Sequence, residues 1–138
     1  MSVLDLNLDQ VPELEIVEEG EYELQIEPKS VMKKESSNGK DYIQARLKIV
    51  GEDTALPVYH RMMLPNKEQS KDVNMMWKRD IKRFMEAFDL DITNIEFTDG
   101  DKQYLKGVEG QKAWAFLKVT EEGDYEPRNE VRRFSTSN

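Results

Sequence analysis

Residues 42–50 read YIQARLKIV and form a stretch with two chemically different faces, the most informative feature of the chain. At the two-residue period of a β-strand, its aliphatic side chains share one face and its polar side chains share the other. The aliphatic face consists of Ile43, Ala45, Leu47 and Ile49, and the polar face of Tyr42, Gln44, Arg46 and Lys48. The first is an ordinary core face. The second places an aromatic ring beside two cations, a combination suited to a flexible polyanion that carries flat bases.

Length and composition limit the class of protein. A chain of 138 residues, with 38% hydrophobic and 35% charged residues, suits one globular domain with a heavily solvated surface. No apolar run approaches the roughly 20 residues that span a bilayer. The acidic start MSVLDLNLDQ argues against a signal peptide. We therefore expect a cytoplasmic protein without membrane contact, and the absence of cysteine excludes disulfides and zinc–thiolate sites.

The net charge of −8 is unevenly distributed. Residues 5–27 contain nine acidic residues and no lysine or arginine, whereas basic residues cluster in 29–48, 60–82 and 128–133. Because salt screens charges over about 8–10 Å, a local basic surface can still bind nucleic acid. We expect residues 1–19 to form a flexible acidic arm and residues 20–138 to form the folded domain.

The periodicity of the chain predicts five strands and one helix. Apolar alternation predicts the five strands. The first begins at Gly20, and the other four span about 42–50, 58–64, 112–119 and 129–134. The Asn38-Gly39 pair predicts a hairpin turn within 33–40. Apolar residues at spacings of three and four predict a helix over 72–88 that begins at Asp72 as N-cap. This apolar stripe consists of Val73, Met76, Trp77, Ile81, Phe84 and Phe88.

The order of three strands, one helix and two strands indicates a mainly β protein. We expect a five-stranded Greek-key barrel of the oligonucleotide/oligosaccharide-binding (OB) type, with one α-helix between the third and fourth strands. Such barrels bind ligands across the outer face of strands two and three. The polar face of 42–50 falls on this surface.

The expected site joins outward side chains of neighbouring strands. On the third strand, Tyr59 and Arg61 face outward if Val58, Met62 and Leu64 face the core. The predicted nucleic-acid-binding residues are therefore Tyr42, Arg46, Lys48, Tyr59, Arg61, Trp114 and Lys40. The competing interpretation is structural, because Tyr and Arg are common on exposed strands and stabilise cross-strand pairs by a few tenths of a kcal/mol.

Two further groups have open interpretations. Trp114 and Phe116 lie opposite the small and aliphatic face of their strand, so either the helix covers them or they stack on bases. The basic helix residues either contact phosphates or form a solvated side, which is the commoner case. These residues are Lys78, Arg79, Lys82 and Arg83. We expect His60, the one histidine, to be a partly buried barrel residue.

No motif in the chain indicates catalysis. There is no glycine-rich phosphate loop, no nucleophile motif and no set of ligands at metal spacing. We therefore expect neither enzymatic activity nor a cofactor or metal.

A series of short signals resembles a known group of proteins. They are Gly20-Glu21-Tyr22-Glu23-Leu24, Asn38-Gly39-Lys40, Val58-Tyr59-His60, Ile81-Lys82-Arg83-Phe84 and Asn129-Glu130-Val131-Arg132-Arg133-Phe134. In this order the chain resembles, over about 12–134, small phage-encoded proteins, some of which are single-stranded DNA-binding proteins with an OB fold. Those proteins often end in an acidic tail, whereas this chain ends in Phe134-Ser135-Thr136-Ser137-Asn138. Recruitment of partners through such a tail is therefore not expected.

The resemblance and the strand pattern predict the same function. We expect sequence-independent binding and protection of single-stranded DNA in phage replication, recombination or repair, in the cytoplasm of the infected host. Replication or recombination proteins are further expected partners, and a homo-oligomer is compatible with the sequence. The alternative is an acidic protein-interaction module on the same barrel without nucleic-acid binding. An oligosaccharide-binding barrel ranks third, because aromatic platforms also serve sugars.

Overall fold

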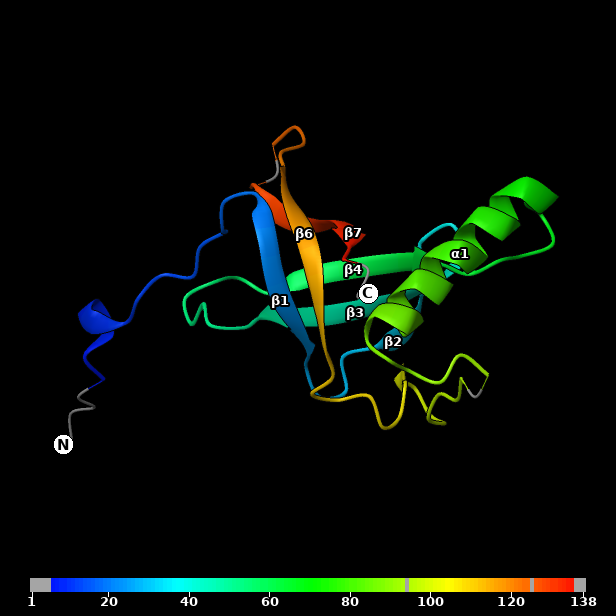
Figure 1. The fold of residues 1–138 in the computed structure, drawn as a ribbon, viewed down its shortest axis with the longest axis horizontal. Coiled ribbons are helices and arrows are strands. Elements are labelled where there is room, and N and C mark those ends of the chain that lie inside the picture. Colours follow the sequence, from blue (N-terminus) through cyan, green and yellow to red (C-terminus); the bar gives the residue numbers. More distant parts are fainter. Residues whose placement is uncertain (1–5, 94, 125, 136–138) are drawn as a thin grey trace.

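The computed structural model describes residues 6–93, 95–124 and 126–135. Within these ranges the protein is mainly β, with antiparallel strands and one long helix (Figure 1). The elements are η1 (Leu8–Gln10), β1 (Gly20–Ile26), β2 (Met32–Glu35), β3 (Asp41–Ile49), β4 (Val58–Met63), α1 (Lys71–Ala87), β5 (Gln103–Tyr104), β6 (Lys112–Thr120) and β7 (Arg128–Phe134). No helix in the described part of the chain is long and apolar enough to cross a membrane.

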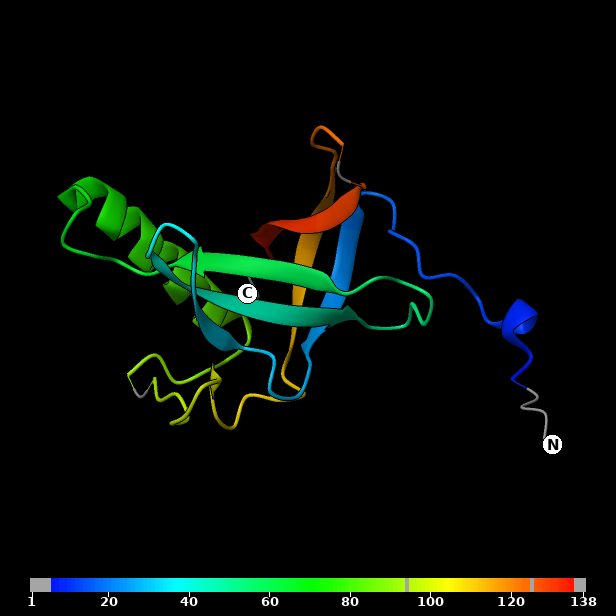
Figure 2. The ribbon, with the colours of Figure 1, turned by 180° about the vertical axis from the view of Figure 1, so that it is seen from behind.

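The described strands form one open sheet in the order β5-β2-β3-β1-β6-β7, and β4 pairs with the other edge of β3. The long strand β3 pairs with β2 through residues 41–44 and with β1 through residues 47–49. The sheet curls, so that β1 and β6 cross in front of β3 and β4 in Figure 1 and behind them in Figure 2. No ladder joins β4 to β7 among the described residues, so the predicted five-stranded barrel appears here as an open, seven-stranded sheet.

Two short strands depart from the predicted order. Residues 33–40 were expected to form only a turn, but Met32–Glu35 pairs with β3 as β2. The turn is confined to residues 36–40. There Ser36 N–H donates to the Lys40 carbonyl at 2.8 Å, and Gly39 has a φ of 77°. Gln103–Tyr104 adds the short strand β5 to the edge of β2. Both are short peripheral strands without an apolar alternation, so hydrophobic periodicity did not reveal them.

The N-cap of the helix lies two residues earlier than predicted. Ser70, and not Asp72, is the N-cap, since its side chain accepts a hydrogen bond from Val73 N–H. The helix ends because Asp89 adopts a left-handed conformation with φ 55°, and Leu90 N–H then bonds to the Met85 carbonyl at 2.8 Å.

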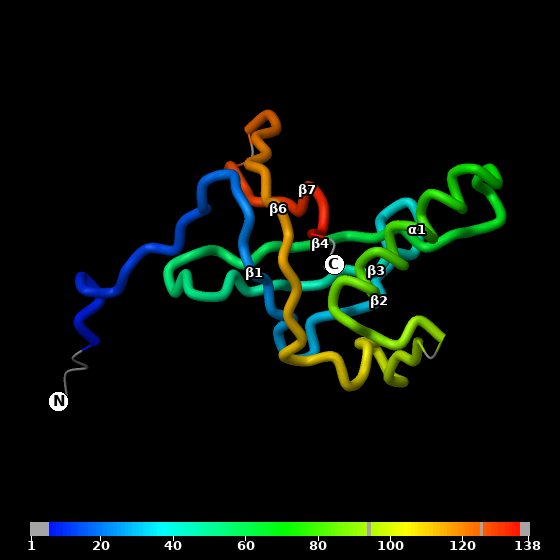
Figure 3. Tube along the Cα trace, viewed as in Figure 1, coloured from blue at the N-terminus to red at the C-terminus, as the bar shows by residue number. Residues whose placement is uncertain are grey.

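The core lies between the curled sheet and the C-terminal half of α1. The predicted aliphatic face of β3 is buried, and so are the inward residues of β4 and β6. Phe84 and Met85 of α1 and the C-cap residue Phe88 pack into this core. The N-terminal half of α1 extends beyond the sheet, as the Cα trace in Figure 3 also shows. Hydrophobic contact therefore fixes only one half of the helix to the sheet.

The N-terminal segment has an attached part and a projecting part. Glu15 forms a parallel bridge with Ala55, and Val17 exchanges two hydrogen bonds with the side chain of Asn129. Residues 6–14 are exposed and extend away from the sheet (Figure 1). The described part of the expected 1–19 arm is thus attached to the sheet at residues 15–17, and residues 1–5 lie outside the described ranges.

Candidate nucleic-acid interface

The β3–β4 hairpin brings four of the predicted residues onto one outer face. The register pairs Arg46 with Tyr59, Gln44 with Arg61 and Tyr42 with Met63. Because side chains opposite each other point to the same side of a sheet, Tyr42, Arg46, Tyr59 and Arg61 share a surface. Figure 2 views the hairpin from this side. We call this surface the hairpin face.

Tyr59 provides the exposed ring of the hairpin face. Its side chain is 53% exposed, and Val58 and Met62 on the same strand are buried. Because these buried neighbours fix the strand, the half-exposed ring of Tyr59 is held in place. It therefore loses little conformational entropy when a ligand binds to its flat surface. It can stack on an unpaired base or on a sugar ring.

Tyr42 is not exposed in the way we predicted. Its ring is only 9% exposed, and the Arg61 guanidinium lies 4.3 Å from the ring centroid. Arg61 is the diagonal cross-strand neighbour of Tyr42, so its long side chain reaches across and covers the ring. The expected exposure of Tyr42 is therefore corrected, while its part in binding stays a prediction. The covering cation itself remains exposed.

Arg46 is exposed but already faces a carboxylate. Its Nε lies 2.6 Å from Oε2 of Glu27, the residue that directly follows β1 in the chain. The carboxylate holds the guanidinium over the outer face, and any phosphate there has to compete with it. Lys48 lies on the same side of β3 but beyond the residues that pair with β4, opposite Gln25 of β1, and it forms no ion pair with another described residue. Unlike Arg46, Lys48 can therefore contact a phosphate without first leaving a carboxylate.

Lys40 and Trp114 lie away from the hairpin face. Lys40 belongs to the β2–β3 turn, where its N–H also bonds to Ser36 Oγ at 3.2 Å. Trp114 is on β6, opposite Glu23, and β1 separates β6 from β3. Trp114 is 50% exposed, so the helix does not bury it. Phe116 is instead partly covered by Arg133, whose guanidinium lies 4.2 Å from the ring centroid.

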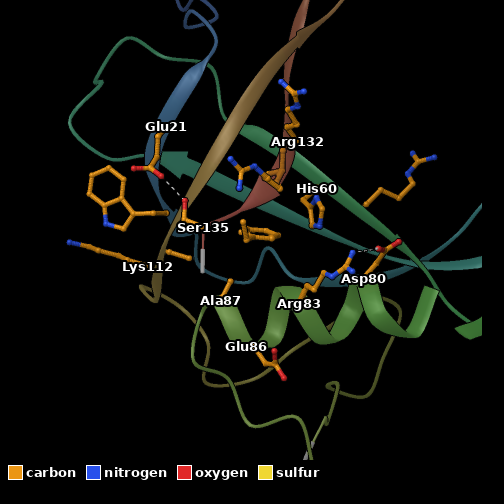
Figure 4. A pocket seen from close by; sticks show the side chains of 15 residues that line it. Glu21, His60, Asp80, Arg83, Glu86, Ala87, Lys112, Arg132 and Ser135 are labelled. Carbon is orange, nitrogen blue, oxygen red and sulfur yellow. Dashed lines mark hydrogen bonds and ion pairs between the residues drawn. The ribbon is translucent and has the colours of Figure 1, made fainter. Parts of the chain in front are cut away.

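A basic hollow that the sequence analysis missed lies between α1, β6 and β7. It has a volume of about 1140 Å³, and His60, Arg83 and Arg132 line it from β4, α1 and β7 (Figure 4). Its cationic lining residues are Arg61, Arg83, Lys112, Arg132 and Arg133, and its acidic ones are Glu21, Asp80 and Glu86. Arg83 lies 3.9 Å from Asp80, whereas Arg132 and Arg133 form no ion pair with the described acids. The hollow therefore presents net positive charge on an acidic protein.

A register shift explains why two consecutive arginines are both exposed. Leu117 pairs with Val131 and Phe116 pairs with Arg133, so Arg132 is an extra residue without a ladder partner. Such a bulge breaks the alternation of faces. Because the shift arises from pairing with β6, strict two-residue alternation along the strand could not reveal it. The only signal in the sequence is the adjacent Arg132-Arg133 pair itself.

His60 lies at the wall of the hollow, and its predicted partial burial is confirmed. Its ring stacks on Phe84 at 5.8 Å and meets the edge of Phe134 at 5.3 Å, measured between centroids. Burial lowers the pKa of His60 to about 4, although Asp80 and Glu130 oppose this shift. The ring is therefore neutral at neutral pH and adds no positive charge. In the described part of the chain no three His, Asp or Glu side chains are grouped to hold a metal ion.

Comparison with known families covers nearly the whole chain. A family model described as "Protein of unknown function (DUF669)" matches residues 4–135, and the chain belongs to this family. No curated protein matches the chain.

Proposed function

We propose that this member of the DUF669 family binds single-stranded DNA without sequence preference, on an OB-type barrel whose β3–β4 hairpin forms the platform. The observation that carries the proposal is the hairpin face, where the exposed ring of Tyr59 lies directly opposite Arg46 and beside Arg61. An aromatic ring among cations is the combination that binds bases and phosphates of an unpaired strand together. Binding would serve phage DNA replication, recombination or repair in the infected cell.

In the proposed mechanism, stacking and charge act at neighbouring points. Tyr59 stacks on a base, which contributes about 1–3 kcal/mol with little dependence on base identity. Lys48 contacts a phosphate directly. Arg46 exchanges the Glu27 carboxylate for a phosphate, and Arg61 contacts a phosphate while it covers Tyr42. The acidic partner of Arg46 then reduces affinity and disfavours nonspecific contact with other polyanions.

Arg61 connects the two basic surfaces. It belongs to the hairpin face and also lines the hollow between α1, β6 and β7. A strand that crosses the hairpin face therefore continues toward Arg132 and Arg133, with the exposed Trp114 near the rim of the hollow. This path supports the predicted role of Trp114, although Trp114 is not part of the hairpin face.

Fluorescence titration with oligothymidylate tests the proposal. The Trp77→Phe variant leaves Trp114 as the reporter tryptophan, and we expect its emission to be quenched as the oligonucleotide binds. Duplex DNA at the same nucleotide concentration should compete weakly, because its base faces are paired. Equal competition by the duplex would refute the proposal, whereas unchanged emission at low salt would exclude Trp114 from the path of the strand.

A second candidate function, a protein-interaction module, is favoured by the Arg46–Glu27 pair. This ion pair neutralises a cation of the proposed platform within a chain of net charge −8. In this case the acidic surface would bind a basic protein and the hairpin face would be structural. Retention on single-stranded DNA resin at low salt, with release by added salt, supports DNA binding. Flow-through at low salt supports the second candidate.

A further inference from the structure

Two exposed apolar segments lie at opposite ends of the molecule (Figure 1). The first is residues 6–14, which we call the arm, and its exposed apolar residues are Leu6, Leu8, Val11 and Leu14. Leu8 is 70% exposed. Apart from the local hydrogen bonds of η1, no hydrogen bond or ion pair attaches the arm to another described residue. Four large aliphatic side chains within nine residues are more than a solvated tether requires.

The second segment is the N-terminal half of α1. The stripe that buries Phe84 and Phe88 in the core continues backward along the helix past the edge of the sheet. There it reaches Trp77 and Val73, which are only partly buried, and Met76, which is 51% exposed. A helix with core spacing along its whole length, but a core against only half of it, has an unpartnered apolar face.

The charges of the two segments are opposite. The arm and its attachment carry Asp9, Glu13 and Glu15 and no basic residue. The exposed half of α1 carries one acid, Asp72, and three cations, Lys71, Lys78 and Arg79, which form no ion pair with another described residue. Lys82 and Arg83, by contrast, are paired with Glu86 and Asp80 within the helix. The unpaired cations therefore lie on the half of the helix that lacks an apolar partner.

We propose that the arm of one copy packs on the N-terminal half of α1 of a second copy. The leucines would cover the Val73–Met76–Trp77 stripe, and the arm's carboxylates would face Lys78 and Arg79. Because the arm and the helix lie at opposite ends of one molecule, each contact is head-to-tail and leaves a free arm and a free helix. Such a heterologous contact builds rings or open chains of copies. This proposal does not depend on DNA binding.

Sedimentation velocity of the full chain without DNA, from about 5 to 500 µM, tests self-association in the range of transient complexes. We expect the weight-average mass to rise with concentration and to fall again in high salt. An arm variant (Leu8→Ser with Val11→Ser) and a helix variant (Met76→Ser with Arg79→Glu) should each associate at least about tenfold more weakly. Ile92→Ser, which alters an exposed apolar residue in the loop after α1, is the matched control and should behave as the wild type. Circular dichroism verifies the folding of each variant.

Mixing the two variants tests the geometry. The helix variant has an intact arm and the arm variant has an intact helix, so an equimolar mixture should form a species of two copies that cannot grow. A mass that stays monomeric over the whole concentration range would overturn the proposal. So would arm or helix variants that associate like the wild type, or a mixture that remains monomeric while the wild type associates.

Discussion

The Arg61 guanidinium lies 4.3 Å from the centroid of the Tyr42 ring and covers it on the outer face of the β3–β4 hairpin. Because of this contact, the two tyrosines on that face differ in exposure and therefore in role. Tyr42 is buried beneath the cation and packs as part of the sheet, whereas Tyr59 remains exposed. Arg61 is held over the ring while its charge stays exposed. The same contact therefore stabilises the hairpin and positions a cation.

Tyr42→Ala should primarily destabilise the protein. Loss of a buried aromatic ring typically costs about 3–5 kcal/mol of the free energy of unfolding. Urea denaturation measures this cost, and Leu47→Ala, on the opposite and fully buried face, provides a comparison at about 2–5 kcal/mol. A Tyr42→Ala protein as stable as the wild type would mean that the ring does not contribute packing energy in solution.

Tyr59→Ala should affect DNA binding and spare the fold. Because half of the ring is exposed, we expect the free energy of unfolding to change by less than about 0.5–1 kcal/mol. Loss of one stacked base should weaken oligothymidylate binding by about 1–3 kcal/mol. Tyr59→Phe, which keeps the ring, should retain most of the affinity. If Tyr59→Ala binds like the wild type, stacking on the hairpin face is refuted.

Affinity for single-stranded DNA should fall with salt. If about three to five phosphates are neutralised, log K should fall with log salt at a slope of roughly −2 to −3.5. Replacing Arg132 and Arg133 together by Ala should make the slope less steep by about 1 to 1.5, because two phosphate contacts are lost. Lys102→Ala, on an exposed loop, should leave the slope unchanged. An unchanged slope in the double variant would exclude the basic hollow from the path of the strand.

Two-residue periodicity predicted the buried faces of β3, β4 and β6 because the small and aliphatic residues of each strand lie mainly on one side. It also predicted which residues within each strand share a face, since this follows from the strand period alone. It could not predict that Tyr42 is covered. That depends on Arg61 being its diagonal neighbour, and so on the register between two strands.

The basic hollow could not be predicted from the sequence, because it too depends on the register between strands. Arg132 and Arg133 are both exposed because a register shift against β6 breaks the alternation of β7. Arg61 and Arg83 meet them only through the packing of α1 against β4 and β7. β2 and β5 were missed because short peripheral strands with polar residues lack an apolar face.

Asn129→Ala should release the N-terminal segment from the sheet. The buried side chain of Asn129 accepts a hydrogen bond from Val17 N–H at 2.8 Å and donates one to the Val17 carbonyl at 2.9 Å. Its removal leaves both backbone groups without this partner, at a cost of about 1–3 kcal/mol. Hydrogen exchange of the Val17 amide should accelerate more than that of Leu24 in β1. An equal acceleration at both amides would indicate global destabilisation and not local release.

The pH dependence of stability should reveal the buried state of His60. Burial between Phe84 and Phe134 lowers the pKa of this imidazole to about 4, from an ordinary value of 6.5. Between these two values the unfolded chain binds a proton that the folded protein does not, so stability rises with pH across this window and is lost on acidification. From pH 7 to pH 5 the loss due to His60 should be about 2 kcal/mol.

The His60→Leu variant removes this titration while it keeps an apolar side chain against Phe84. Urea denaturation of both proteins at pH 7 and pH 5 should therefore show a decline in the wild type that is about 2 kcal/mol larger than in the variant. Carboxylates contribute little to the difference, because they are common to both proteins. The sign is diagnostic. If the wild type were instead more stable at pH 5, the folded protein would hold the proton more tightly than the unfolded chain. Asp80 and Glu130, whose charges raise the pKa, would then outweigh the burial that lowers it.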